Sequence, residues 1–186
     1  MKNEGSPSWV GAPDQWTHVC KNHKKDCSIA EVGVYNGASV KIICEAKKDM
    51  SLFLFDTFEG LVDLIEEDKL FFEEGQYKAS EDIVREYLAK YKNVEICKGV
   101  FPVDTGKFIL DKKFALVNID VDTYNSTYDS LCFFADKMIK NGYIIVHDYY
   151  AVLAVKDAVD EFLKEFSVEH YTTERVLTQI IIQIKK

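Results

Sequence analysis

Hydrophobic positions along the chain follow two alternating spacings. Short stretches rich in apolar residues are typical of buried strands, and they occur at 27–32, 51–55, 93–97, 114–119 and 143–147. Between them, apolar residues recur every three or four positions, which is the spacing of an amphipathic helix. These longer segments are 37–48, 80–91, 126–141 and 154–166. The stretch 168–186 predicts two further strands, joined by a turn near Glu174–Arg175.

Strands that alternate with helices predict βαβ units and a parallel sheet. Right-handed crossovers would place the helices on both faces of that sheet. The C-terminal hairpin would add an antiparallel strand. The length of 186 residues suits one domain, which we place at 27–186, after a short N-terminal segment at 1–26.

One segment, 59–79, has no clear periodicity. It is acidic and carries aromatic residues among its charges. It is either a lid over a site or a solvated insertion.

Composition narrows the class of protein. The chain has 31 acidic and 23 basic residues and no basic stripe, which argues against nucleic-acid binding. The five cysteines are an odd number without a CxxC spacing, as expected for a reducing compartment and no disulfide framework. The chain shows neither an apolar signal region nor a run long enough to span a membrane. We therefore expect a cytoplasmic protein.

The residues after the first strand are informative, because ligands of open α/β sheets bind outside the carboxyl ends of the strands. Gly33 and Gly37 frame a tight turn that leads into a helix. The turn is not GxGxxG, and Glu31 just before it would repel a phosphate but suit a cationic group. The alternative is a purely structural turn.

The second and third strands end in further candidates. Asp56 could accept hydrogen bonds from ribose hydroxyls, or it could form an Asx turn or cap a helix. Gly99 and Phe101 could line an adenine slot, or they could be a loop glycine and a core phenylalanine.

The fourth and fifth strands end in charged residues. Asp120 and Asp122 follow the fourth strand, and His147 and Asp148 follow or end the fifth. Neighbouring carboxylates repel each other unless a cation or a shared proton relieves them. Two carboxylates and an imidazole could hold a divalent cation. Alternatively, Asp120 faces solvent, Asp122 caps a turn and His147 is a hydrogen-bonded histidine.

Several of these stretches together resemble a known family. They are EVGVYNGASV, LFDTFEGL, KGVFPVDT, NIDVDTYNSTYDSL, NGYIIVHDYY and AVKDAVDEF. In this order they resemble the class I S-adenosylmethionine-dependent methyltransferases, specifically the macrocin O-methyltransferase group (the TylF, MycF and NovP type). The resemblance spans roughly residues 29–163.

The resemblance implies a Rossmann-like, seven-stranded sheet with S-adenosylmethionine over its carboxyl edge. Asp120 would bind a metal ion and act as the general base. His147 and Asp148 would be further metal ligands for Mg²⁺ or another divalent cation, with His147 in place of an aspartate of the usual pair. The implied cofactor-binding residues are Glu31, Gly33, Tyr35, Asn36, Gly37, Ser39, Asp56, Thr57, Phe58, Gly99, Val100 and Phe101.

The implied reaction is methylation of a hydroxyl on a sugar, a glycoside or a related small molecule. The N-terminal segment is shorter than in the family, so a second subunit could complete the acceptor pocket of a homodimer. Two other functions stay open. One is a metal-dependent nucleotide-sugar glycosyltransferase, which the Gly33/Gly37 turn disfavours. The other is a degenerate cofactor-binding module without activity.

Overall fold

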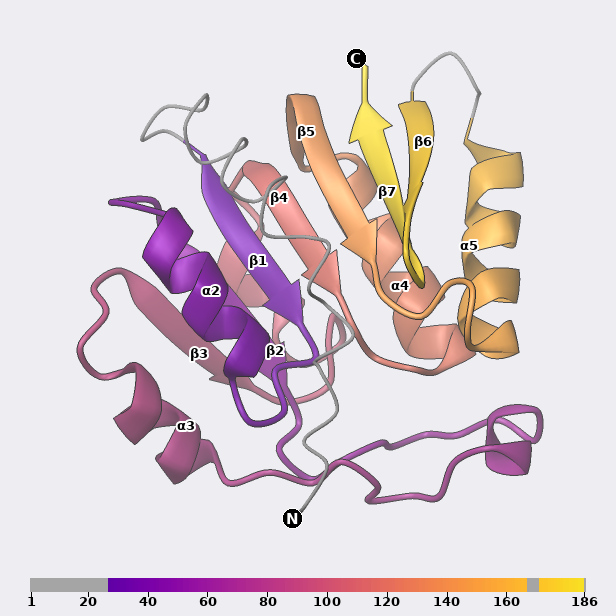
Figure 1. The fold of residues 1–186 in the computed structure, drawn as a ribbon, viewed down its shortest axis with the longest axis horizontal. Coiled ribbons are helices and arrows are strands. Elements are labelled where there is room, and N and C mark those ends of the chain that lie inside the picture. The colour runs from indigo at the N-terminus through magenta and orange to yellow at the C-terminus, as the bar shows by residue number, and fades with distance from the viewer. Residues whose placement is uncertain (1–26, 167–170, 186) are drawn as a thin grey trace.

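The computed structural model describes residues 27–166 and 171–185, and the N-terminal segment 1–26 lies outside them. Its centre is a seven-stranded sheet in the order β3-β2-β1-β4-β5-β7-β6 (Figure 1). The parallel strands are β1 (Ser28–Val32), β2 (Leu52–Asp56), β3 (Val94–Lys98), β4 (Phe114–Ile119) and β5 (Met138–Val146). Antiparallel to β5 lies β7 (Gln179–Ile184), which pairs with the edge strand β6 (Tyr171–Val176). The predicted α/β fold is confirmed.

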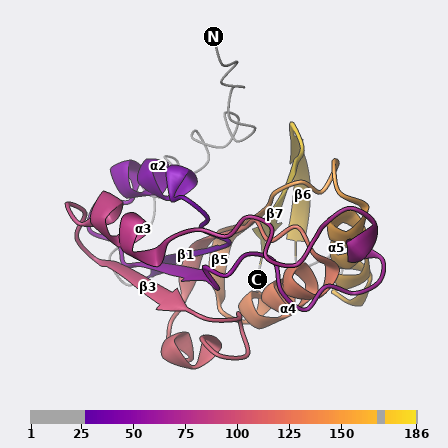
Figure 2. The ribbon, with the colours of Figure 1, turned by 90° about the horizontal axis from the view of Figure 1, so that it is seen from below.

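Helices cover both faces of the sheet (Figure 2). On one face lie α2 (Ala38–Ala46) and α3 (Glu81–Leu88), packed on strand residues such as Ile29 and Leu54. On the other face lie α4 (Tyr124–Ala135) and α5 (Leu153–Glu165), packed on strand residues such as Val117 and Ile144. Two short 3₁₀ helices complete the list, η1 (Asp68–Leu70) and η2 (Gly106–Ile109). None of the helices in the described part of the chain is long and apolar enough for a membrane span.

The structure corrects the predicted helix at 126–141. That helix ends at Ala135, and residues from Met138 onward belong to β5. Gly142, which the sequence suggested as a helix stop, instead lies in an irregular part of β5, where the pairing with β4 shifts register. A side chain at Gly142 would come within 3.2 Å of the Phe114 carbonyl oxygen, so a glycine fits this close approach.

The predicted turn near Glu174–Arg175 is also wrong. Both residues lie within β6, and the hairpin turns at Leu177 and Thr178, with Leu177 at a positive φ of 56°. Charged residues suggested a turn, but an edge strand also carries charges on its exposed positions. Arg175 is held there over the Tyr150 ring, 4.0 Å from its centroid.

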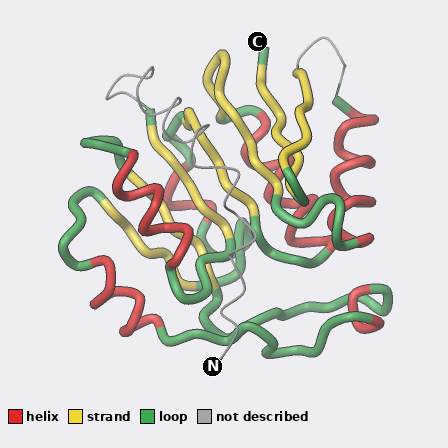
Figure 3. Tube along the Cα trace, in the orientation of Figure 1, coloured by secondary structure: helices red, strands yellow, loops and turns green. Residues whose placement is uncertain are grey.

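The residues from 57 to 80, which we call the β2–α3 segment, contain one 3₁₀ turn and otherwise run as loop (Figure 3). Figures 1 and 2 show this segment passing along the carboxyl edge of the sheet toward the starts of α4 and α5. It therefore borders the edge where ligands of such sheets bind.

Candidate functional site

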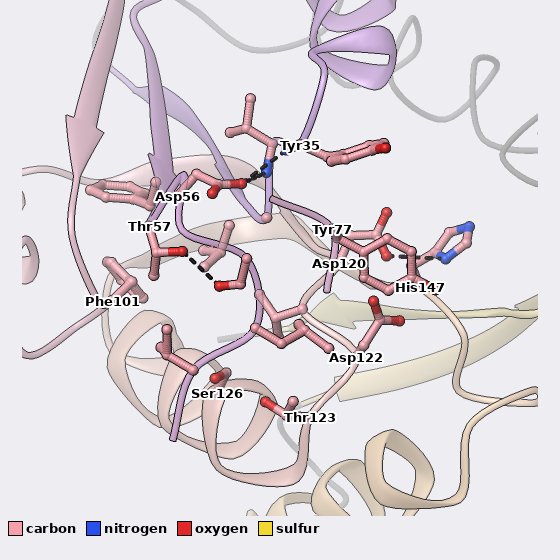
Figure 4. Close-up of a pocket in the computed structure, with 18 of the residues that line it drawn as sticks. Tyr35, Asp56, Thr57, Tyr77, Phe101, Asp120, Asp122, Thr123, Ser126 and His147 are labelled. Carbon is pink, nitrogen blue, oxygen red and sulfur yellow. Dashed lines mark hydrogen bonds and ion pairs between the residues drawn. The ribbon is translucent and has the colours of Figure 1, made fainter. Parts of the chain in front are cut away.

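A cavity of about 340 Å³ lies at the carboxyl edge of the sheet (Figure 4). Residues that follow all five parallel strands line it, although they are far apart in sequence. They are Gly33 after β1, Asp56 at the end of β2, Gly99 after β3, Asp120 after β4, and His147 and Asp148 after β5. The predicted candidates thus share one cavity.

Most of the predicted cofactor residues line this cavity. These are Gly33, Tyr35, Asn36, Ser39, Asp56, Thr57, Gly99, Val100 and Phe101. Three others do not: Glu31 is fully buried behind the turn, Phe58 is a core side chain, and Gly37 starts α2 beside Tyr87. Phe101 fits both of its interpretations, because it lines the cavity and also stacks on Phe134 in the core.

The turn between β1 and α2 depends on glycine. Gly33 has a φ of 87°, and a Cβ there would lie 1.8 Å from the Asp120 carbonyl oxygen. The ends of β1 and β4 can therefore approach each other only if this residue has no side chain. Gly37, at a φ of 76°, caps α2 without a side-chain hydrogen bond. The first N–H groups of α2 thus receive no side-chain cap from this residue.

The Asp56 carboxylate ties this turn to β2. Its Oδ2 accepts hydrogen bonds from the backbone N–H groups of Val34 (2.7 Å) and Tyr35 (2.9 Å). Its Oδ1 accepts one from the Phe58 N–H (2.7 Å). The last bond is the Asx turn that the sequence allowed. Since a carboxylate offers about four lone-pair sites, one site on Oδ1 is left for a ligand.

Glu31 lies fully buried beneath the turn. Its Oε1 accepts hydrogen bonds from the Ser39 hydroxyl (2.6 Å) and the Asn118 amide (2.9 Å), and its Oε2 has no hydrogen-bond partner. Burial raises the pKa of Glu31 to about 8; the two hydrogen bonds oppose this shift, and the charges of Asp120 and Asp56 add to it. The carboxyl group is therefore largely protonated at neutral pH until a cation approaches.

The charged edge of the cavity consists of Asp120, His147 and Asp148. The His147 Nδ1 lies 3.2 Å from the Asp120 Oδ1 and 2.9 Å from the Asp148 Oδ2. One ligand atom from each residue lies within 4.8 Å of the other two. Burial alone would lower the pKa of His147, but the two carboxylates outweigh it and raise the pKa to about 10. The carboxylates thus strongly attract positive charge, whether a proton on His147 or a metal ion.

Asp122 also lines the cavity, with a positive φ of 60°. Burial raises its pKa to about 7, and the charges of Asp120 and Asp148 contribute. The alternative that Asp122 caps the following helix turn finds no support. The first N–H of α4, at Tyr124, instead donates to the Asp68 Oδ1 at 3.3 Å.

The β2–α3 segment supplies a wall of the cavity that the sequence did not resolve. Gly60, Leu61, Val62 and Tyr77 line the cavity from this segment. Backbone hydrogen bonds join its two arms, from the Leu61 N–H to Gln76 (2.8 Å) and from the Gly75 N–H to Leu61 (2.9 Å). The only sequence signal was the presence of apolar and aromatic side chains among acidic residues. Thr123 and Ser126, at the start of α4, were also missed.

Comparison with known proteins gives one curated relative at modest identity. It is the demethyldecarbamoylnovobiocin O-methyltransferase of Streptomyces niveus, which is 27% identical over 163 residues. The match covers 75% of this chain and 59% of that protein, so the chain spans less than two thirds of the relative's length.

Solved methyltransferase structures share the fold. The O-methyltransferase NovP superposes with a TM-score of 0.79 at 23% identity, covering 95% of this chain and 81% of that one. A TDP-rhamnose 3'-O-methyltransferase of calicheamicin biosynthesis superposes with a TM-score of 0.67 at 13% identity, covering 92% and 77%. The family model described as Macrocin-O-methyltransferase (TylF) matches residues 16–177. The chain therefore belongs to the macrocin O-methyltransferase family.

Proposed function

We propose that the protein transfers the methyl group of S-adenosylmethionine to a hydroxyl of a sugar unit in a small-molecule acceptor, and that a divalent cation assists. The observation that carries this proposal is the single cavity that joins the glycine turn and Asp56 to the Asp120–His147–Asp148 edge. Family membership favours methyl transfer over the glycosyltransferase alternative. The names of the novobiocin and TDP-rhamnose enzymes support a sugar as the acceptor.

The cofactor side of the cavity suits S-adenosylmethionine. The α2 N-terminus attracts a carboxylate, since its first N–H groups carry partial positive charge. Glu31, whose second oxygen has no partner, lies behind the same turn and would stabilise the cationic end of the methionine part. The remaining lone pair of Asp56 would accept a ribose hydroxyl, and Phe101 would contact the adenine. When bound, the cofactor supplies a methyl group that its positive sulfur already activates.

The charged edge suits a divalent cation. Asp120 and Asp148 would each offer an oxygen and His147 a nitrogen, all close enough for one ion. Oxygen ligands suit Mg²⁺, while an imidazole ligand shifts the preference toward ions such as Mn²⁺ or Zn²⁺. A cation here would lower the pKa of the acceptor hydroxyl and orient it.

Two carboxylates are placed to take the proton from that hydroxyl. Asp120 is the predicted base, but as a cation ligand it would lose basicity. Asp122 lines the same cavity and is not one of the three proposed cation ligands, so it is the second candidate for the general base. The rest of the rate enhancement would come from holding hydroxyl and methyl group in line, worth roughly 7–11 kcal/mol.

The test is transfer of an isotopically labelled methyl group from S-adenosylmethionine to a panel of glycosides, with Mg²⁺, with Mn²⁺ and with a chelator. We expect Asp120→Asn to lower turnover by about a thousandfold and to abolish cation binding measured by calorimetry. If Asp122 is the base, Asp122→Asn lowers turnover by about 10²–10⁴-fold and keeps cation binding. Unchanged transfer in Asp120→Asn would contradict the proposal, and cofactor binding without transfer to any acceptor would favour the degenerate module. UDP-sugars tested in parallel cover the glycosyltransferase alternative.

A further inference from the structure

An apolar groove of about 410 Å³ lies beside the cavity. Three elements line it with apolar side chains: Ile65, Leu70 and Phe71 of the β2–α3 segment, Tyr124 of α4, and Leu153 and Ala154 of α5. Leu70, Phe71 and Leu153 are 76%, 67% and 61% exposed, which is unusual for side chains of this size on one small surface. Figure 1 shows η1 as the purple turn at the lower right, below the start of α5.

Three stretches of chain run from the lining of the cavity to the lining of the groove. Val62 lines the cavity and Ile65 the groove, while Thr123 lines the cavity and Tyr124 the groove. The third link runs from Asp148 to Leu153, through hydrogen bonds from the Ala151 and Val152 N–H groups to the Asp148 carbonyl (2.9 and 2.8 Å). The groove therefore opens next to the charged edge of the cavity.

Buried Asp68 fixes the two hollows relative to each other. Its Oδ1 accepts from the Tyr124 N–H and its Oδ2 from the Ile65 N–H, both at 3.3 Å. The carboxylate meets the free N–H groups and positive end of α4, which has no acidic residue in its own first turn. One wall thus serves the cavity on one side and the groove on the other.

The positions of the cavity and the groove determine which part of a bound cofactor and acceptor would lie nearest the groove. The cofactor would occupy the side of the cavity near Gly33, Asp56 and Gly99. An acceptor hydroxyl must then lie near Asp120 and Asp122, on the side that leads to the groove. The part of the acceptor beyond its reacting sugar would then lie on the side of Thr123 and Tyr124, toward the groove.

The charged residues of the groove indicate what chemistry the part of the acceptor beyond its reacting sugar would have. Glu67 and Asp157 line the groove, and none of its lining residues in the described ranges 27–166 and 171–185 is a lysine or an arginine. Lys156, next to Asp157 in the chain, is paired with Asp160, and Lys69, near Glu67, is paired with Glu66. The groove thus combines apolar contact area with two negative charges, a combination that suits an apolar cation.

We propose that this groove binds the part of the acceptor beyond the reacting sugar, and that this part is an apolar group carrying a positive charge, such as an aryl or alkyl ammonium. The assignment rests on the proposed function for the site of reaction. The binding chemistry of the groove itself can be measured independently of methyl transfer.

The test uses a matched pair of phenyl glycosides, one with an aminomethyl group on the ring and one with a neutral acetamidomethyl group. Calorimetry with the full chain measures the dissociation constant of each. We expect the cationic glycoside to bind about five- to tenfold more tightly, because a screened charge contact contributes up to about 1 kcal/mol per pair and 1.4 kcal/mol is tenfold. Asp157→Asn combined with Glu67→Gln should remove this preference, and Phe71→Ser should weaken both probes by about fivefold or more.

Glu95→Gln is the matched control, because Glu95 is an exposed carboxylate on β3 at the opposite edge of the sheet. It should keep the preference for the cationic probe. Equal affinity for the two probes, or a preference that survives Asp157→Asn with Glu67→Gln, would overturn the proposal. So would a change from dimer to monomer in Phe71→Ser, which would mark the groove as a contact between two copies. If the wild-type chain did not bind S-adenosylmethionine but still preferred the cationic glycoside, the result would count against the proposed function alone.

Discussion

The two sides of the cavity are built in different ways. On the side proposed for the cofactor, which we call the cofactor side, backbone groups make most of the contacts: strand ends pack directly on each other at Gly33, and Asp56 binds three backbone N–H groups. On the side proposed for the acceptor, which we call the acceptor side, charged side chains gather at Asp120, His147 and Asp148, and a loop segment forms the wall. The packed backbone of the cofactor side allows only one shape. On the acceptor side, individual side chains determine which ligand binds. The two sides should therefore respond differently to substitution.

The largest effect is expected for Gly33→Ala. The new Cβ would meet the Asp120 carbonyl oxygen at 1.8 Å, so β1 and β4 must separate. We expect a loss of about 4 kcal/mol in the free energy of unfolding, at the exceptional end of single substitutions, and loss of cofactor binding. Gly37→Ala is the control: its nearest contact is at 3.5 Å, so only strain from the positive φ remains, about 1 kcal/mol. Equal destabilisation in denaturant titrations would contradict the close-packing argument.

The next effect concerns pH. The pKa of Glu31 rises from 4.5 to about 8 on folding, so between these values the folded chain holds a proton that the unfolded chain has lost. The contribution of Glu31 to stability is therefore most favourable below about pH 4.5 and declines as the pH rises to about 8. Glu31→Gln removes this dependence. From pH 5 to 8, the unfolding free energy of the wild-type chain should fall relative to that of Glu31→Gln. Parallel curves for the two proteins would refute this role of Glu31.

Asp56→Asn should have a smaller effect that is still specific to the cofactor side. The amide has only one oxygen, so it cannot accept from both the turn and the Phe58 N–H. We expect a loss of about 2 kcal/mol in stability and weaker binding of S-adenosylmethionine, with cation binding at Asp120 unchanged. If calorimetry showed weaker cation binding but normal cofactor binding, the division into two sides would be wrong.

The smallest effect tests the wall of the acceptor side. Asp68→Ala removes the cap of α4 and should cost about 1 kcal/mol. Ser80→Ala removes the cap of α3, where the Ser80 hydroxyl accepts from the Ile83 N–H, and should cost a similar amount. Only Asp68→Ala should raise the KM for the acceptor, because only Asp68 holds the wall to α4. Equal KM values in the two variants would show that the wall needs no such anchor.

The same contrast explains what the sequence could predict. The parallel strands were found because each contains a short stretch rich in apolar residues, and the topology then brought their final residues to one edge. The sequence left the β2–α3 segment open between a lid and a solvated insertion, because the segment has no periodicity and its anchor, Asp68, caps a helix that starts 56 residues later. The prediction for residues 136–142 was wrong for a local reason. Met138 and Ile139 fit the apolar pattern of either the end of a helix or the start of a strand. The raised pKa of Asp122 could not be predicted from the sequence, since burial and neighbouring charges set it.

Assignment of the cavity to the cofactor can be tested by calorimetric titration of S-adenosylmethionine into the full chain and into Asp56→Asn, without added cation. We expect one molecule bound per wild-type chain and about tenfold weaker binding to the variant, the effect of one lost hydrogen bond to a charged group. No binding to the wild-type chain, or equal affinity in the two proteins, would contradict the assignment of this cavity to the cofactor.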